Sequence, residues 1–405
     1  MPDDKFYFGP DDVYPRQRAL FDQVERYLLA RLRSLYDSRG RLWNRDFSSP
    51  AAYETSVEPN RQHFLSILGG WPWQREPLNP RRELIREFAK FRLERVSYRV
   101  FTGIETDALL LVPPGSGPFP AVLCQVGVNG SPERICGLVN DKVNDADLTY
   151  HRIGSRLAEH GYVVIATRMV TGFDPRMTRD LDHRAPHLMT GHEPEIRNYL
   201  LDAYGKDEAK KFASYTNARV HIDRLCRLAG GSIFGLEYFA LSRGIDVLCD
   251  LPEVDAGRIG MYGLSQGGLS ALWLPALDKR IQATAASAFF NERFTKQVVR
   301  TPNSGPFLFS SEEYHMLPML AEFSDADIAS LVCPRCFFVE CGRKDDAVYF
   351  EQSLEAFAQV KAIYERLGIP DRCGHRLHEG GHETEPLDNV ADIAAVKFLD
   401  RWLKR

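Results

Sequence analysis

The hexapeptide Gly-Leu-Ser-Gln-Gly-Gly at 263–268 restricts the fold more than any other part of the sequence, because it lies between an apolar run and a helix-like stretch at 269–277. A serine attacks carbonyl carbons when it sits at the tip of a sharp strand-to-helix turn, where the next backbone N–H binds the developing oxyanion. That turn strains the serine and crowds positions two before and two after it, here Gly263 and Gly267. The pattern predicts a nucleophile elbow at Ser265. A glycine-rich turn without chemistry is the alternative.

The length and charge of the chain agree with an enzyme of this kind. Its 405 residues suggest one large domain with additions, or two domains. A formal net charge of -4 without a basic block argues against nucleic acid or an anionic membrane as the main partner. No apolar run approaches the roughly 20 residues that span a bilayer, and residues 1–5 are acidic and polar, unlike a signal peptide. We therefore expect a cytoplasmic protein, with its oligomeric state left open.

The eight cysteines are scattered along the chain, and Cys124, Cys336 and Cys341 lie in apolar runs. This is typical of small buried side chains in a reducing compartment. Residues 333–336 form a CxxC pair, but they lead directly into a strand and no second pair follows at zinc spacing. The sequence therefore predicts neither a metal site nor a cofactor.

Residues 1–95 are expected to form a helical N-terminal extension. Apolar residues recur at steps of three and four between Arg18 and Tyr36, which predicts an amphipathic helix that ends near Gly40. A second helix is predicted to begin at Asn79-Pro80 and to continue through Leu84, Ile85, Phe88 and Phe91.

Residues 96–405 are expected to form the catalytic domain, because short strands alternate there with helices, as in a mostly parallel sheet covered on both faces. An antiparallel pair at 96–101 and 107–112 opens it. The core strands are predicted at 120–126, 162–167, 258–262, 283–289 and 336–341. Apolar spacing predicts helices near 354–367 and 390–402. The polar segment 168–231 is too long for a simple connection and is expected to be a lid-like insertion over the site.

A serine nucleophile needs a base and an acid that orients the base, and in this kind of fold they follow the serine in the order acid, then histidine. Asp345 follows the strand at 336–341, and Asp346 is the second choice. The base candidates are His375, His378 and His382. His382 is favoured because it follows two glycines, in a loop before the last helix.

Residues 378–382 also match HExxH, a zinc-binding pattern that works only on a helix, where both imidazoles share one face. Its two central glycines disfavour a helix, and no third ligand is evident downstream. The insertion contains further histidines, but Pro186 and Gly191 interrupt their spacing: His183, His187 and His192. We therefore disfavour zinc at both places.

Two backbone N–H groups are expected to bind the oxyanion. One belongs to Gln266, directly after the nucleophile. The other should come from the loop at 125–130, whose glycines allow a close backbone approach, and Val128 is the candidate. A plain tight turn is the alternative for this loop.

Together these motifs resemble the α/β-hydrolase superfamily, and within it acetyl xylan esterases, cephalosporin deacetylases and dienelactone-hydrolase-like relatives. The acetyl xylan esterases and cephalosporin deacetylases carry a GGSQGG elbow, an HGYNG-type oxyanion loop and a GHE at the histidine. This chain has GLSQGG, then Val-Gly-Val-Asn-Gly at 126–130, and Gly-His-Glu at 381–383. The resemblance covers about residues 96–405 and implies a serine esterase that hydrolyses small, mainly acetyl, esters, including those of carbohydrates.

The chain departs from these relatives in several places. Val128 replaces the tyrosine of their oxyanion loop, Val126 replaces its histidine, and of the Arg-Gly-Gln after the fourth strand only Arg168 remains. The N-terminal extension and the insertion are also foreign to the compact deacetylases. A serine peptidase of the dipeptidyl peptidase type and a noncatalytic binding protein on the same fold therefore stay as alternatives.

Overall fold

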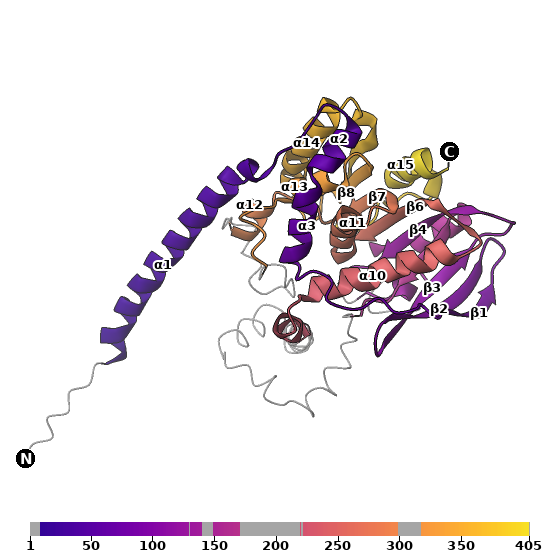
Figure 1. The fold of residues 1–405 in the computed structure, drawn as a ribbon, viewed down its shortest axis with the longest axis horizontal. Helices are drawn as coiled ribbons and strands as arrows, with labels where there is room; N and C mark the ends of the chain where they lie inside the picture. The colour runs from indigo at the N-terminus through magenta and orange to yellow at the C-terminus, as the bar shows by residue number, and fades with distance from the viewer. Residues whose placement is uncertain are drawn as a thin grey trace, which may run out of the picture.

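The computed structural model describes residues 9–128, 130–139, 149–170, 219, 222–298 and 317–404. Nine strands form one sheet in the order β1-β2-β3-β5-β4-β6-β7-β8-β9 (Figure 1). The strands are β1 (Arg81–Glu87), β2 (Arg92–Phe101), β3 (Ile104–Val112), β4 (Phe119–Gln125), β5 (Val163–Thr167), β6 (Val254–Leu264), β7 (Ile281–Ser287), β8 (Cys336–Gly342) and β9 (Cys373–His378). The first three pair antiparallel, as does β3 with β5, and all later pairings are parallel.

Helices cover both faces of this sheet, and each face has its own apolar core. On one face lie α3 (Glu58–Ile67), α10 (Ile233–Asp250), α11 (Gln266–Leu277), α13 (Asp325–Val332) and α14 (Phe350–Arg366). On the other face lie α4 (Pro132–Ile135), α6 (Ile153–Glu159) and α15 (Ala394–Leu403). Every residue of β5 and β8 is buried. This two-sided burial explains their mostly apolar sequences and confirms the predicted core strands.

The remaining described helices are short, apart from α1 (Pro10–Ser38). They include η1 (Arg39–Leu42), α2 (Pro50–Ser56), α12 (Arg293–Val298), η3 (Pro370–Arg372) and η4 (Val390–Asp392). No helix in the described ranges combines the length and apolar character that a bilayer crossing requires.

The predicted N-terminal helix exists as α1, which extends away from the rest of the molecule (Figure 1). Its last turns contact the body, where the Tyr36 ring lies 4.9 Å from that of Phe294 and the Tyr36 hydroxyl hydrogen-bonds Glu292. Farther toward the N-terminus the apolar side is open, with Leu20 62% and Tyr27 65% exposed. The helical spacing was therefore informative about secondary structure but not about burial.

The helix predicted from Asn79 is wrong, because this segment is the edge strand β1. All seven residues of β1 are exposed, so no apolar alternation distinguished it from a helix. Pairing with β2 and cross-strand ion pairs stabilise it instead, such as Arg82 with Glu94 at 2.6 Å. Asn79 has a φ of 45° rather than the extended backbone of an N-cap. The sheet therefore begins before residue 96.

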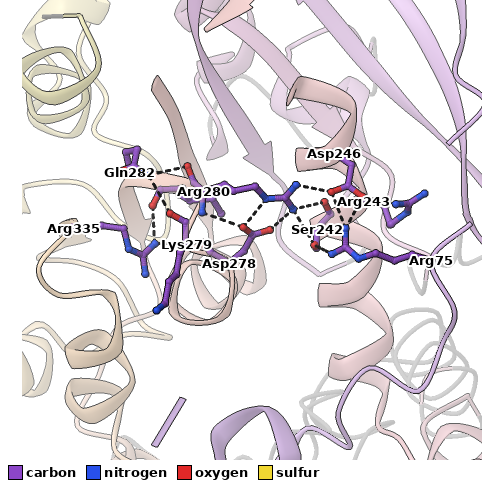
Figure 2. A network of polar contacts seen from close by, with 10 residues as sticks. Arg75, Ser242, Arg243, Asp246, Asp278, Lys279, Arg280, Gln282 and Arg335 are labelled. Atoms are coloured by element: carbon purple, nitrogen blue, oxygen red, sulfur yellow. Dashed lines mark hydrogen bonds and ion pairs between the residues drawn. The ribbon is translucent and has the colours of Figure 1, made fainter. Parts of the chain in front are cut away.

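An ion-pair network ties the N-terminal region to the body at the amino end of β7 (Figure 2). Arg280, directly before that strand, donates to Asp246 at 2.6 Å and to Asp278 at 2.6 Å. Arg75 donates to the same Asp246 at 2.8 Å and to the Ser242 hydroxyl at 2.8 Å. Because catalytic loops of parallel sheets follow the carboxyl ends of the strands, this network lies at the opposite edge from the candidate site.

Candidate active site

Ser265 connects β6 to α11 in a strained conformation, with φ 62° and ψ -123°. Its backbone N–H donates to the carbonyl of Ser287, at the end of β7, at 3.0 Å. A Cβ on Gly263 would lie 2.0 Å from the carbonyl oxygen of Gly267, and one on Gly267 would lie 2.0 Å from that of Gln125. The two glycines are therefore required sterically. Ser265 itself has a backbone conformation that residues other than glycine rarely adopt.

Asp345 and His382 are in contact at the same edge of the sheet. His382 Nδ1 lies 2.9 Å and 3.0 Å from the two carboxylate oxygens of Asp345. Asp345 Oδ1 also accepts the backbone N–H groups of Ala347 at 2.8 Å and Val348 at 2.9 Å, and the carboxylate is buried. Asp346 is exposed. Of the two candidate acids, Asp345 is thus the one in contact with the imidazole of His382.

This contact occupies Nδ1 of His382 and leaves Nε2 unengaged by Asp345. In the part of the chain that the structure describes, no hydrogen bond joins His382 Nε2 to Ser265 Oγ. Catalytic hydrogen bonds are often long without substrate and shorten when it binds.

The other two histidine candidates lie elsewhere. His375 packs between Ser353 Oγ at 3.3 Å and Cys341 Sγ at 3.7 Å, and burial lowers the pKa of its imidazole to about 4. His378 is buried, and its Nδ1 accepts the Gly380 N–H at 3.1 Å. His378 ends β9 and His382 follows in a loop, so the HExxH residues do not share a helix face.

The two predicted oxyanion donors flank the elbow. Gln266 is the first residue of α11, and its side-chain amide lies 3.3 Å from Glu237. Gly127 packs against the nucleophile, because a Cβ built on it would lie 3.0 Å from Ser265 Cβ. Val128 follows in an exposed turn. Both segments therefore lie where backbone N–H groups can approach a carbonyl bound at Ser265.

Comparisons with known proteins agree with this arrangement. The acetyl xylan esterase (AXE1) family pattern matches residues 234–307, which include the elbow. In Bacillus subtilis (strain 168), the protein named "Putative hydrolase YtaP" is 29% identical over 178 residues, which is 44% of this chain. The match spans 56% of that relative's length.

Solved structures with a similar fold extend over most of the chain. A "putative acetyl xylan esterase" from Bacteroides fragilis NCTC 9343 has a TM-score of 0.60 at 17% identity, covering 94% of this chain and 84% of its own. This chain is an α/β hydrolase by fold. A glucuronoyl esterase from Solibacter usitatus has a TM-score of 0.52 at 16% identity. The match covers 85% of this chain and 93% of the esterase.

One buried carboxyl joins the parts of the site, and sequence reasoning missed it. Glu340, in β8, accepts hydrogen bonds from the hydroxyls of Ser287 at 2.8 Å and Tyr262 at 3.0 Å, and from the Glu385 N–H at 3.3 Å. Ser287 in turn holds the Ser265 N–H. The elbow and the histidine loop are therefore both attached to this side chain.

Burial raises the pKa of Glu340 from its ordinary value of 4.5 to about 7. Between these values the folded state binds more protons than the unfolded state, so the stability from this group falls as pH rises through about 7. We expect the urea unfolding free energy of the wild type to drop by about 2 kcal/mol more than that of Glu340→Gln between pH 5 and pH 8. Glu365→Gln, at an exposed carboxyl, is the control and should behave like wild type. Equal pH dependence in Glu340→Gln and wild type would exclude Glu340 as the source.

Further contacts around the site are not predicted by any of the motifs. Tyr150 Oη accepts the Gly127 N–H at 3.0 Å, and Glu383 hydrogen-bonds His151 Nε2 at 2.7 Å. Arg168 is held by Asp107 at 2.8 Å. The three histidines of the insertion, His183, His187 and His192, lie outside the described residues.

Proposed function

We propose that this protein is a serine carboxylic-ester hydrolase that acts on small acyl esters of carbohydrates, with acetyl as the favoured acyl group. The observation that supports this most is the contact between His382 and Asp345. It lies at the carboxyl ends of the parallel strands, where the strained Ser265 also lies. The family pattern and the fold of carbohydrate esterases support the same substrate class.

In this proposal, Ser265 Oγ attacks the ester carbonyl while His382 Nε2 takes its proton. The oxyanion is held by the N–H groups of Gln266 and Val128. His382 then returns the proton to the departing alcohol, and the acyl group stays on Ser265. A water activated by His382 releases the acid by the same steps in reverse. Asp345 keeps Nδ1–H of the imidazole oriented throughout and stabilises its charged form.

The proposal is tested by hydrolysis of p-nitrophenyl esters of increasing acyl length, followed by acetylated xylan and a methyl glucuronate ester. We expect turnover of the acetate ester that falls steeply with longer acyl chains. Pretreatment with a fluorophosphonate should abolish it, whereas a chelator should have no effect. Cleavage of peptide p-nitroanilides without ester hydrolysis would favour a peptidase. Folded protein that turns over none of these compounds would contradict the proposal.

A further inference from the structure

Tyr150 reaches the oxyanion loop from a different part of the chain. It precedes α6, is 6% exposed, and accepts the backbone N–H of Gly127 on its hydroxyl oxygen at 3.0 Å. The loop after β4 therefore does not stand alone beside the nucleophile. The buried phenol of Tyr150 is hydrogen-bonded to its backbone.

The same hydroxyl lies close to Ser265. A Cβ built on Gly127 would be 3.0 Å from Ser265 Cβ and 3.2 Å from Tyr150 Oη. One methyl-sized group would thus touch both residues, so the phenol oxygen borders the small space beside the nucleophile. Any side chain at position 127 would fill that space, which explains why a glycine suits this position.

In the described part of the chain, the proton of the Tyr150 hydroxyl is available to a ligand. Its oxygen already accepts the Gly127 N–H, and among the described residues none accepts the proton of the hydroxyl. Burial raises the pKa of Tyr150, so the phenol stays protonated at neutral pH. A hydrogen bond received by the oxygen polarises the O–H and strengthens it as a donor.

We infer that the Tyr150 hydroxyl donates a hydrogen bond to the oxyanion that forms at Ser265. Because the Gly127 N–H is engaged by the phenol, the loop contributes the Val128 N–H, α11 contributes the Gln266 N–H, and the Tyr150 hydroxyl is the third donor. Tyr150 is then a catalytic residue, and this role rests on the proposed serine chemistry. The loop has valine at 126 and 128, whose side chains cannot donate a hydrogen bond. The Tyr150 hydroxyl supplies a side-chain donor that these two positions lack.

The backbone around Tyr150 is fixed by the loop that carries His382. The Thr384 N–H donates to the Thr149 carbonyl at 3.0 Å, and the Thr384 hydroxyl donates to the Tyr150 carbonyl at 3.1 Å. His151 hydrogen-bonds Glu383 at 2.7 Å. The base and the phenol are therefore positioned by one set of contacts, as a donor organised before the reaction requires.

Tyr150→Phe tests this inference. We expect kcat for p-nitrophenyl acetate to fall about 10²-fold with little change in KM, because the donor acts on charge that develops in the transition state. The rate constant for fluorophosphonate labelling of Ser265 should fall similarly, since phosphonylation also places negative charge on an oxygen in this site. Tyr162→Phe is the matched control, because that buried hydroxyl bonds Asp400 at 2.8 Å, away from the elbow. It should keep wild-type rates.

A structural role alone would lower the melting temperature or the fraction of labelled protein without slowing labelling of the folded molecules. Unchanged kcat and labelling rate in folded Tyr150→Phe would overturn the inference. If this variant does not fold, 3-fluorotyrosine at position 150 decides. The more acidic phenol should move the alkaline loss of labelling to lower pH, and an unchanged pH profile would overturn the inference.

The labelling readout separates the two proposals. If wild type labels at Ser265 but hydrolyses no ester, the proposed function fails while the labelling rates still decide the role of Tyr150. If wild type does not label at all, both proposals fail.

Discussion

Replacing His382 with alanine is expected to lower kcat for p-nitrophenyl acetate by a factor on the order of 10⁵, because Ser265 then loses the group that takes and returns its proton. KM should change little, since the imidazole acts mainly on the transition state. The double variant with Ser265→Ala should lose no more activity than either single variant, because residues that act as one unit are not additive. Steady-state kinetics on freshly purified protein measures all three.

The matched control is His378→Asn, which retains an acceptor for the Gly380 N–H that His378 Nδ1 now binds. It should keep kcat within a few-fold of wild type. A loss on the order of 10⁵ in His378→Asn with an active His382→Ala would assign the base to His378 instead.

Replacing Asp345 with asparagine is expected to lower kcat about 10⁴-fold, with little effect on folding. The backbone N–H groups of Ala347 and Val348 bind Asp345 Oδ1 and would hold the amide oxygen of asparagine. Its NH₂ group would then face His382 Nδ1, which is where the carboxylate now lies. This geometry makes Nδ1 an acceptor and places the proton on Nε2, so the imidazole can no longer act as a base.

Asp346→Asn provides the control, because this neighbouring aspartate is exposed and adjacent in sequence. We expect it to retain wild-type kcat. The measurement is the pair of kcat values, together with circular dichroism to show that both variants fold. Equal activity of the two variants would remove Asp345 from the mechanism.

The parts of the fold that were predictable are those whose burial shows in the sequence. The strands β5 and β8 are buried throughout, and their sequences are mostly apolar. The edge strand β1 has no buried face, so its exposed residues fitted a helix equally well. The apolar spacing of α1 predicted a helix but could not show that much of that side stays exposed.

The candidate site follows the same division. The elbow needs its residues at fixed spacing, so Ser265 and its glycines could be found from the sequence alone. The choice between Asp345 and Asp346 depends on which way two adjacent side chains point, and only coordinates show that. Tyr150 and Glu340 reach the site through contacts between distant parts of the chain, such as Thr384 with Tyr150, and belong to no local pattern.

The hydrogen bonds of the elbow also set when this site can exist during folding. The Ser265 N–H needs the carbonyl of Ser287 in β7, and the Ala288 N–H needs that of Glu340 in β8. A growing chain that has just passed residue 268 contains the whole elbow sequence and neither of those carbonyls. The Ser265 N–H can therefore be satisfied only after β7 has paired with β6, so we expect recovery of a reactive serine on refolding to report that this pairing has formed.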